Sequence, residues 1–248
     1  MIHSDFPLIA VTKPWGFEFE FYDNANISAW ILVIGREHKS GYLTEANSTS
    51  FHMHSKKTTH ILCLQGALEI KTQHLRTIIR KGEIQSINPR VFHQISAHLA
   101  NSIAIEIETP SNRSDIIRLE DQYGRQGTGY SWEKECPTTM FAVQSELRST
   151  NKLKSIEITG DKECPVLRTS GFKIYKSENL MQSLGNLPTK SLIICSQGII
   201  SDMSGNYLFQ PGDIVSFAHL KELIRLAMTA SMPTISALLV ELDDDLKQ

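Results

Sequence analysis

The sequence predicts an all-β protein made of two tandem barrels of antiparallel strands, with a short helical segment between them. Residues 7–110 contain short runs of β-forming residues separated by Gly, Asn or Pro about every 8–12 residues, which is typical of a sandwich or barrel. Residues 151–248 repeat part of the same pattern more weakly. We therefore expect a first domain over 1–126, a connecting segment over 127–150 and a second domain over 151–248.

The strands of the first domain are predicted from hydrophobic alternation. FEFEFYD and SIAIEIET alternate apolar and polar residues, as half-buried strands do, whereas AWILVIG is apolar almost throughout. HILCLQGALEIKT and LRTIIRKGEIQSI are interrupted at Gly66 and Gly82, which predicts hairpin turns at these glycines.

Residues 112–125 (NRSDIIRLEDQYGR) predict the short helix. Ser114 is suited to cap its N-terminus, and Asp115 is suited to its first turn. Its apolar side would comprise Ile116, Ile117 and Leu119. The following residues, 126–150, are rich in Gly, Ser, Thr and Pro and predict the connecting segment.

Composition excludes several classes of protein. The formal net charge of -2 and the absence of long basic runs predict that the chain does not bind nucleic acid. No apolar run approaches the roughly 20 residues that a membrane helix needs, and the N-terminus does not resemble a signal peptide. The 4 cysteines are widely spaced, without a CxxC pair, so we expect a reduced cytoplasmic protein without a thiolate zinc site or disulfides.

Histidines mark the candidate site. His52 and His54 are two residues apart, so on an extended strand they point to the same face and can reach one metal ion. His93 follows in a second turn-rich stretch. Three neutral imidazoles suit one divalent transition metal, such as Zn, Fe, Ni or Mn, and leave coordination positions open. The alternative is that these histidines are polar core residues of a metal-free barrel. His60 is expected on the opposite strand face, away from the site.

The second domain is predicted to lack a metal. TKSLIICSQGIISDMSGNYLFQPGDIVSF aligns with residues 58–87, so that Gly198 matches Gly66. The positions equivalent to His52, His54 and Thr59 are then occupied by Leu184, Asn186 and Ser191.

The spacing of these residues resembles that of the cupins, small double-sheet jelly rolls. Five residues match the spacing of the two cupin motifs: His52, His54, Gly66, Gly82 and His93. Ala46 stands where the first motif has its opening glycine, and Thr59 stands where it has a glutamate. The resemblance implies a bicupin whose second copy is degenerate.

A narrower resemblance concerns residues 11–126. KPWG at 13–16 is similar to the opening of the cupin in mannose-6-phosphate isomerases of the bifunctional guanylyltransferase type. The end of that cupin is matched by Asp115, Ile116, Arg118, Asp121, Tyr123, Gly124 and Arg125. The resemblance implies a sugar-phosphate substrate and a metal held at positions 52, 54, 59 and 93. That family has glutamine and glutamate where this chain has His52 and Thr59. The lost carboxylate leaves the site more positive, which favours an anionic substrate.

Two glutamates are candidate catalytic bases. Glu106 and Glu108 share one face of SIAIEIET, and three isoleucines occupy the other. If the isoleucines pack against another layer, the carboxylates line the pocket, and desolvation would raise the pKa of one of them. The alternative is a solvated strand face.

Three cations are candidate substrate-binding residues. Lys57 lies in a loop at the expected barrel mouth and aligns with an arginine of the isomerase motif, so it could bind phosphate as a point charge. Arg118 and Arg125 could grip a phosphate with paired hydrogen bonds. The alternatives are a mobile surface loop for Lys57 and a purely structural role for the arginines.

Three functions follow from these residues. The first is a metal-dependent isomerase or epimerase of a sugar phosphate or related carbohydrate, which transfers a proton through a metal-stabilised enediolate. The second is a three-histidine Fe(II)-dependent oxygenase. The third is a sugar-phosphate-binding regulatory module without turnover. In each case the partner would be a small anionic molecule, and resemblance to cupins makes a homodimer plausible.

Overall fold

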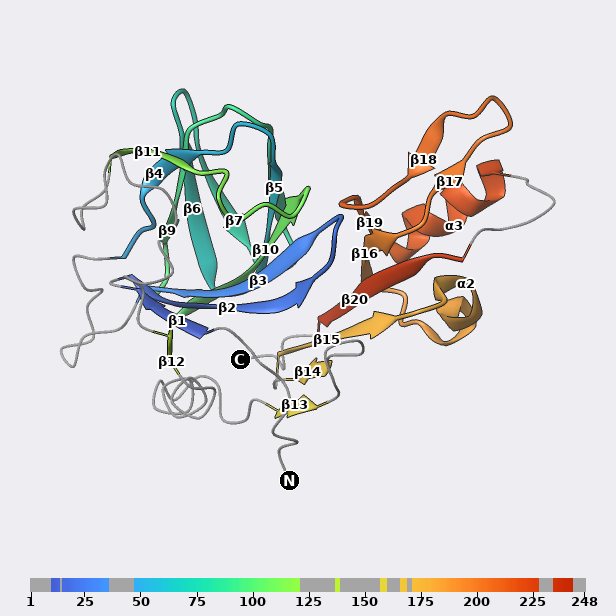
Figure 1. The fold of residues 1–248 in the computed structure, drawn as a ribbon. Helices are drawn as coiled ribbons and strands as arrows, with labels where there is room; N and C mark the ends of the chain where they lie inside the picture. Colours follow the sequence, from blue (N-terminus) through green and yellow to red (C-terminus); the bar gives the residue numbers. More distant parts are fainter. Residues whose placement is uncertain are drawn as a thin grey trace. The chain divides into compact units, whose positions relative to one another are not determined.

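The computed structural model describes residues 10–13, 15–35, 47–120, 137–138, 157–159, 166–168, 171–227 and 234–242. The chain divides into two compact units, one formed by Leu8–Lys154 and the other mainly by Ser155–Gln248. Figure 1 shows strands as the dominant element of both, which confirms the all-β class. No helix within these ranges has the length and apolar character needed to cross a membrane.

Two antiparallel sheets form the first unit. The larger sheet has the order β12 (Pro137–Thr138), β1 (Ala10–Lys13), β2 (Gly16–Asp23), β3 (Ser28–Ile34), β10 (Ser102–Thr109), β5 (Thr58–Gln65) and β8 (Ile84–Ile87). The smaller sheet has the order β11 (Ile117–Glu120), β4 (Phe51–Met53), β9 (His93–Ala97), β6 (Ala67–Thr72) and β7 (Arg76–Arg80). One apolar cluster joins residues of both sheets, including Leu32 and Ile61 from the larger and Leu68 and Ile95 from the smaller. The two sheets therefore pack face to face, as in a jelly roll.

Strand register divides the inner face of the larger sheet into an apolar end and a polar end. Successive rows across β3, β10 and β5 are Leu32–Ala104–Cys63, Trp30–Glu106–Ile61 and Ser28–Glu108–Thr59. Because side chains two apart share a face, Glu106 and Glu108 point to the same side as the apolar core. The isoleucines of β10, which occupy the opposite face, are buried as well. The inner face is therefore apolar in the row of Ala104, has one carboxylate between apolar neighbours in the row of Glu106, and is polar throughout in the row of Glu108.

The predicted helix over 112–125 is wrong in its described part. Residues 117–120 form strand β11, which pairs antiparallel with β4 so that Arg118 lies opposite His52. Ile117 and Leu119 are 48% and 47% exposed, whereas Arg118 is buried, which is the alternation of an edge strand. The open edge of β4 offers hydrogen bonds that a four-residue helical turn could not match. Residues 121–125 lie outside the described ranges.

The second unit contains a sheet of six strands and a two-stranded ribbon. The sheet has the order β13 (Glu157–Thr159), β14 (Val166–Arg168), β15 (Phe172–Ser177), β20 (Ser236–Leu242), β16 (Leu192–Gln197) and β19 (Ile214–Ser216). The ribbon comprises β17 (Ile200–Ser201) and β18 (Tyr207–Phe209). The helical elements are α2 (Leu180–Ser183), the 3-10 turn η2 (Leu184–Asn186) and α3 (Phe217–Ala227).

The two stretches that the weak sequence repeat aligns share backbone hydrogen bonds at one hairpin of each unit. The Cys63 N–H donates to the carbonyl of Glu83 and the Gly82 N–H donates to the carbonyl of Cys63, at N···O distances of 3.1 and 2.8 Å. The second unit has the same pair of bonds, from Cys195 to the Asp213 carbonyl and from Gly212 to the Cys195 carbonyl, both at 2.9 Å. The two stretches thus share a backbone hydrogen-bond pattern as well as a residue pattern.

Beyond this hairpin the second unit differs from the predicted barrel. Five residues after Gly212 the chain enters helix α3, where the first unit continues toward His93. Four residues of α3 pack in the core of this unit, with helical spacing: Phe217, Leu220, Leu223 and Ala227. This spacing was the signal for a helix in the sequence. In the described residues α3 contributes to the core beside the six-stranded sheet, and no second five-stranded sheet is formed. The predicted connecting segment, 127–150, lies almost wholly outside the described ranges.

Gly16 begins β2 and permits a close contact between β2 and β3. Its φ is 149°, and a Cβ built there would lie 1.8 Å from the carbonyl oxygen of Val33. We therefore expect Gly16→Ala to lower the free energy of unfolding of the first unit by more than about 3 kcal/mol. Urea unfolding followed by tryptophan fluorescence measures this, because all 3 tryptophans lie in that unit. The control is Gln73→Ala, because Gln73 lies exposed between β6 and β7 of the same unit. An unchanged transition in Gly16→Ala would contradict the described contact.

Candidate metal centre and its pocket

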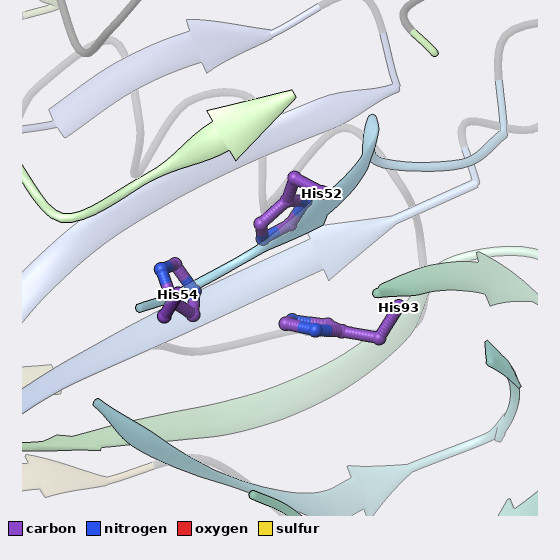
Figure 2. Close-up of side chains that lie close together, drawn as sticks. All are labelled: His52, His54 and His93. Atoms are coloured by element: carbon purple, nitrogen blue, oxygen red, sulfur yellow. The ribbon is translucent and has the colours of Figure 1, made fainter. Parts of the chain in front are cut away.

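Three histidines converge inside the first unit (Figure 2). His52 on β4 pairs with His93, the first residue of β9, and His54 follows β4 directly. One ring nitrogen from each residue lies within 4.8 Å of the corresponding nitrogens of the other two. All three side chains are buried. The structure therefore brings together the three residues that the sequence singled out.

Backbone carbonyls fix the tautomer of each imidazole. The Nδ1–H groups of His52, His54 and His93 donate to the carbonyl oxygens of Ser50, Asp115 and Val91 respectively. A carbonyl oxygen only accepts, so the proton sits on Nδ1 and the lone pair sits on Nε2. The Nε2 atoms of His54 and His93 are buried and have no hydrogen-bond partner. This is the arrangement of metal-binding histidines, whose second nitrogen is held by an outer hydrogen bond.

Burial keeps the imidazoles neutral. Desolvation lowers the pKa of His54 to about 3 and that of His93 to about 4, with a further contribution from the positive charge of Lys57. Desolvation and the neighbouring histidines hold the pKa of His52 well below its usual value. Three neutral nitrogen donors within 4.8 Å of one another suit a divalent transition metal ion.

Asp115 holds the loop that follows His54. Its Oδ1 accepts the backbone N–H of Ser55 at 2.8 Å, and its Oδ2 accepts those of Lys56 and Lys57 at 2.8 and 3.1 Å. Partial burial opposes ionisation, but these bonds and one from the Ser55 hydroxyl together lower the pKa of Asp115 to about 2. Asp115 therefore anchors a loop and orients His54, and does not begin a helix.

Asp115→Ala should lower the free energy of unfolding by about 2–4 kcal/mol, because three backbone donors lose a charged acceptor. The pKa of Asp115 is lowered on folding, so its stabilisation is complete above its ordinary value of 3.8 and is lost as the pH falls toward 2. The difference between wild type and variant should therefore shrink across that acid range, measured by chemical unfolding at each pH. Asp23→Ala is the control, because Asp23 is exposed and accepts one bond from the Ser111 hydroxyl. Equal effects of the two substitutions would contradict this account of Asp115.

A pocket opens onto His52 and His54. Sixteen residues line it: Lys13, Trp15, Glu18, Trp30, Leu32, Thr49, Ser50, His52, His54, Lys57, Ile95, Glu106, Glu108, Arg113, Ile116 and Arg118. Both glutamates singled out in the sequence line it, and so do two of the three cations. The third, Arg125, lies outside the described ranges.

Lys57 is not on a mobile surface loop. Its side chain is 3% exposed, and its Nζ lies 2.5 Å from Oε1 of Glu108. The carboxylate of Glu108 also accepts a hydrogen bond from the Ser28 hydroxyl at 3.3 Å. The sequence placed Lys57 at the barrel mouth because strand β4 ends nearby, but it could not show the countercharge on β10.

Glu106 lies in the pocket in an environment that disfavours its ionised form. Burial raises its pKa well above the usual range, and the negative charges of Glu108 and Glu18 raise it further, while Lys57 opposes them. A carboxylate in such an environment is a stronger base than one in water. The structure thus assigns different environments to two glutamates that the sequence could not distinguish.

The sequence missed the rest of the pocket wall. Trp15 of the KPWG stretch belongs to the core cluster and also lines the pocket, and Trp30 lines it opposite Glu106. The Arg113 guanidinium lies 5.7 Å from the centre of the Trp30 ring and is hydrogen-bonded to Glu20. The acidic positions of FEFEFYD were the available signal, since alternation places Glu20 on the face that bears Trp30.

His60 faces away from the centre, as strand alternation predicted. Its Nδ1 lies 2.7 Å from the hydroxyl of Ser86 on the neighbouring strand β8. It does not belong to the group of three histidines.

Comparison with known proteins gives similarity at the level of structure alone. No protein-family model and no curated protein matches the chain. KdgF from Halomonas sp. is similar over 40% of this chain and 84% of its own, with 15% identity and a TM-score of 0.35. The capsular polysaccharide assembling protein CapF from Staphylococcus aureus is similar over 47% of this chain and 35% of its own, with 15% identity and a TM-score of 0.39. An RmlC-like cupin from Shewanella frigidimarina is similar over 39% of this chain and 77% of its own, with 10% identity and a TM-score of 0.32. Similarity at this level does not establish an activity.

Proposed function

We propose that the first unit is a cupin-type, metal-dependent enzyme that transfers a proton on a small anionic carbohydrate, such as a sugar phosphate. One observation carries this proposal. Three buried, neutral imidazoles converge beside a pocket that two of them, His52 and His54, line together with a carboxylate, Glu106, whose pKa is raised by burial. A metal site beside a base of raised pKa suits proton abstraction next to a carbonyl group.

His52, His54 and His93 would hold the metal through their Nε2 atoms. A bound divalent ion supplies a Lewis acid that polarises a carbonyl oxygen and stabilises the negative charge that develops on it. Three nitrogen donors are compatible with Zn, Fe, Ni or Mn.

Glu106 is the proposed base. In an aldose–ketose isomerisation it would take the proton from carbon 2 and return a proton to carbon 1, while the hydroxyl proton on oxygen 2 moves to oxygen 1. Substrate and product then have the same composition, and no oxidant is consumed. Because desolvation raises its pKa, Glu106 binds the abstracted proton more strongly than an ordinary carboxylate does.

The remaining wall suits a charged sugar. Trp15 and Trp30 offer aromatic surface to the apolar face of a sugar ring, and the charged residues around them suit hydroxyl groups. Arg118 is our choice for the phosphate, because a guanidinium can donate two parallel hydrogen bonds to it. Lys57 is a weaker choice, since Glu108 already neutralises its charge.

The test is incubation of the metal-loaded protein with mannose 6-phosphate and related aldose phosphates in heavy water. We expect formation of the ketose phosphate with deuterium at carbon 1, and deuterium at carbon 2 of the aldose phosphate that re-forms from it, both lost after treatment with a chelator. No deuterium and no ketose with any of the four metals would contradict the proposal. Oxygen consumption by the iron-loaded protein would favour an oxygenase instead.

A further inference from the structure

A metal ion held only by the three histidines would be poorly neutralised. The imidazoles carry no charge, so the ion would retain its two positive charges in a buried site, which is costly without an anionic partner. The carboxylate that borders the cluster is Glu108. Its Oε1 lies 3.6 Å from Nε2 of His54, and the residue is 7% exposed.

This distance is close to the separation of two ligands of one metal. Donors bound at about 2.1 Å with angles of about 90–109° lie about 3.0–3.4 Å apart. His54 Nε2 has no hydrogen-bond partner, so the 3.6 Å contact is not a hydrogen bond that metal binding would break. Glu108 is not part of the group of three residues whose nitrogens lie within 4.8 Å of one another, so its side chain must rotate toward His52 and His93 to join an ion on His54.

We propose that Glu108 is the fourth protein ligand of the metal centre, an inference that rests on the metal site of the proposed function. Lys57 at 2.5 Å from Oε1 and the Ser28 hydroxyl at 3.3 Å from Oε2 orient the carboxylate, which then shares its negative charge between Lys57 and the ion. The centre is then a three-histidine, one-carboxylate site, and its carboxylate comes from β10 on the larger sheet. Glu106, one row deeper on the same strand face, remains available as the base.

Thr59 provides a matched position for a test. It lies directly opposite Glu108 in the β5–β10 register, in the same row of the inner face. Its side chain is fully buried, and its hydroxyl has no hydrogen-bond partner. Exchanging the two side chains, in Thr59→Glu/Glu108→Thr, moves the carboxylate to the adjacent strand without changing the composition of the site.

The experiment is titration of metal-free full-length protein with Zn²⁺ against a chromophoric chelator, together with the visible spectrum of bound Co²⁺. We expect Glu108→Thr to weaken Zn²⁺ binding by about 10–100-fold and to change the Co²⁺ spectrum. The exchange variant should recover affinity to within about fivefold of wild type. Glu106→Gln, altered on the same strand face, should bind Zn²⁺ within about threefold of wild type.

Loss of Glu108 leaves Lys57 buried without its countercharge, so Lys57→Met/Glu108→Thr is measured as well. We expect this double variant to show the same loss of Zn²⁺ affinity. Wild-type affinity and an unchanged Co²⁺ spectrum in a folded Glu108 variant would overturn the ligand assignment and leave the proposed function intact. A wild-type protein that binds neither ion would overturn both.

Discussion

Glu106→Gln is expected to lower kcat by about 10²–10⁴-fold, the usual contribution of a positioned base. Glutamine keeps the shape of the side chain and cannot accept the proton. The same substitution should raise the thermal midpoint of the metal-free protein by a few degrees, since it removes a carboxylate held near Glu108 and Glu18. Proton transfer is measured by deuterium incorporation, and stability by calorimetry.

The control for this prediction is Glu69→Gln. Glu69 lies on β6 in an exposed ion pair with Arg76, and its replacement should alter neither kcat nor the thermal midpoint measurably. A Glu106→Gln variant that is folded, loaded with metal and as active as wild type would show that another group is the base.

His93→Ala is expected to weaken metal binding by more than about 100-fold and to abolish proton transfer. Loss of a residue that only hydrogen-bonds to a metal ligand weakens metal binding by about 10–100-fold, so a larger loss indicates a ligand. His93 comes from a different strand than His52 and His54, so its removal leaves only two imidazoles on one side of the centre. Bound metal per protein, measured after gel filtration, reports the first effect. His60→Ala is the matched control, because His60 also lies on a strand but bonds to Ser86 outside the centre. Full metal content in His93→Ala would contradict the three-histidine centre.

The polar site could be predicted because it depends on the period of a strand. Alternation places His52 and His54 on one face, puts His60 on the other and pairs Glu106 with Glu108. These relations need no knowledge of distant contacts. His93 was added through the resemblance to the second cupin motif, whose spacing Gly82 and His93 match, and in the structure His93 on β9 pairs with His52 on β4.

Other features depend on contacts that a local pattern does not contain. Residues 117–120 have a weak helical pattern, and the edge of β4 decides that they form β11. Lys57 is buried because Glu108 lies across from its loop, on a strand about 50 residues later in the chain. Helix α3 could have been predicted from the sequence, because the spacing of Phe217, Leu220 and Leu223 is helical. The resemblance of this stretch to the first half of the chain concealed that pattern.

The central claim is that His52, His54 and His93 hold a metal ion. Anomalous diffraction from crystals of protein purified without chelators tests it most directly. We predict one anomalous peak about 2.0–2.2 Å from the Nε2 atom of each of the three histidines. Protein that carries stoichiometric metal but gives its peak elsewhere, or gives none at these atoms, would contradict the account.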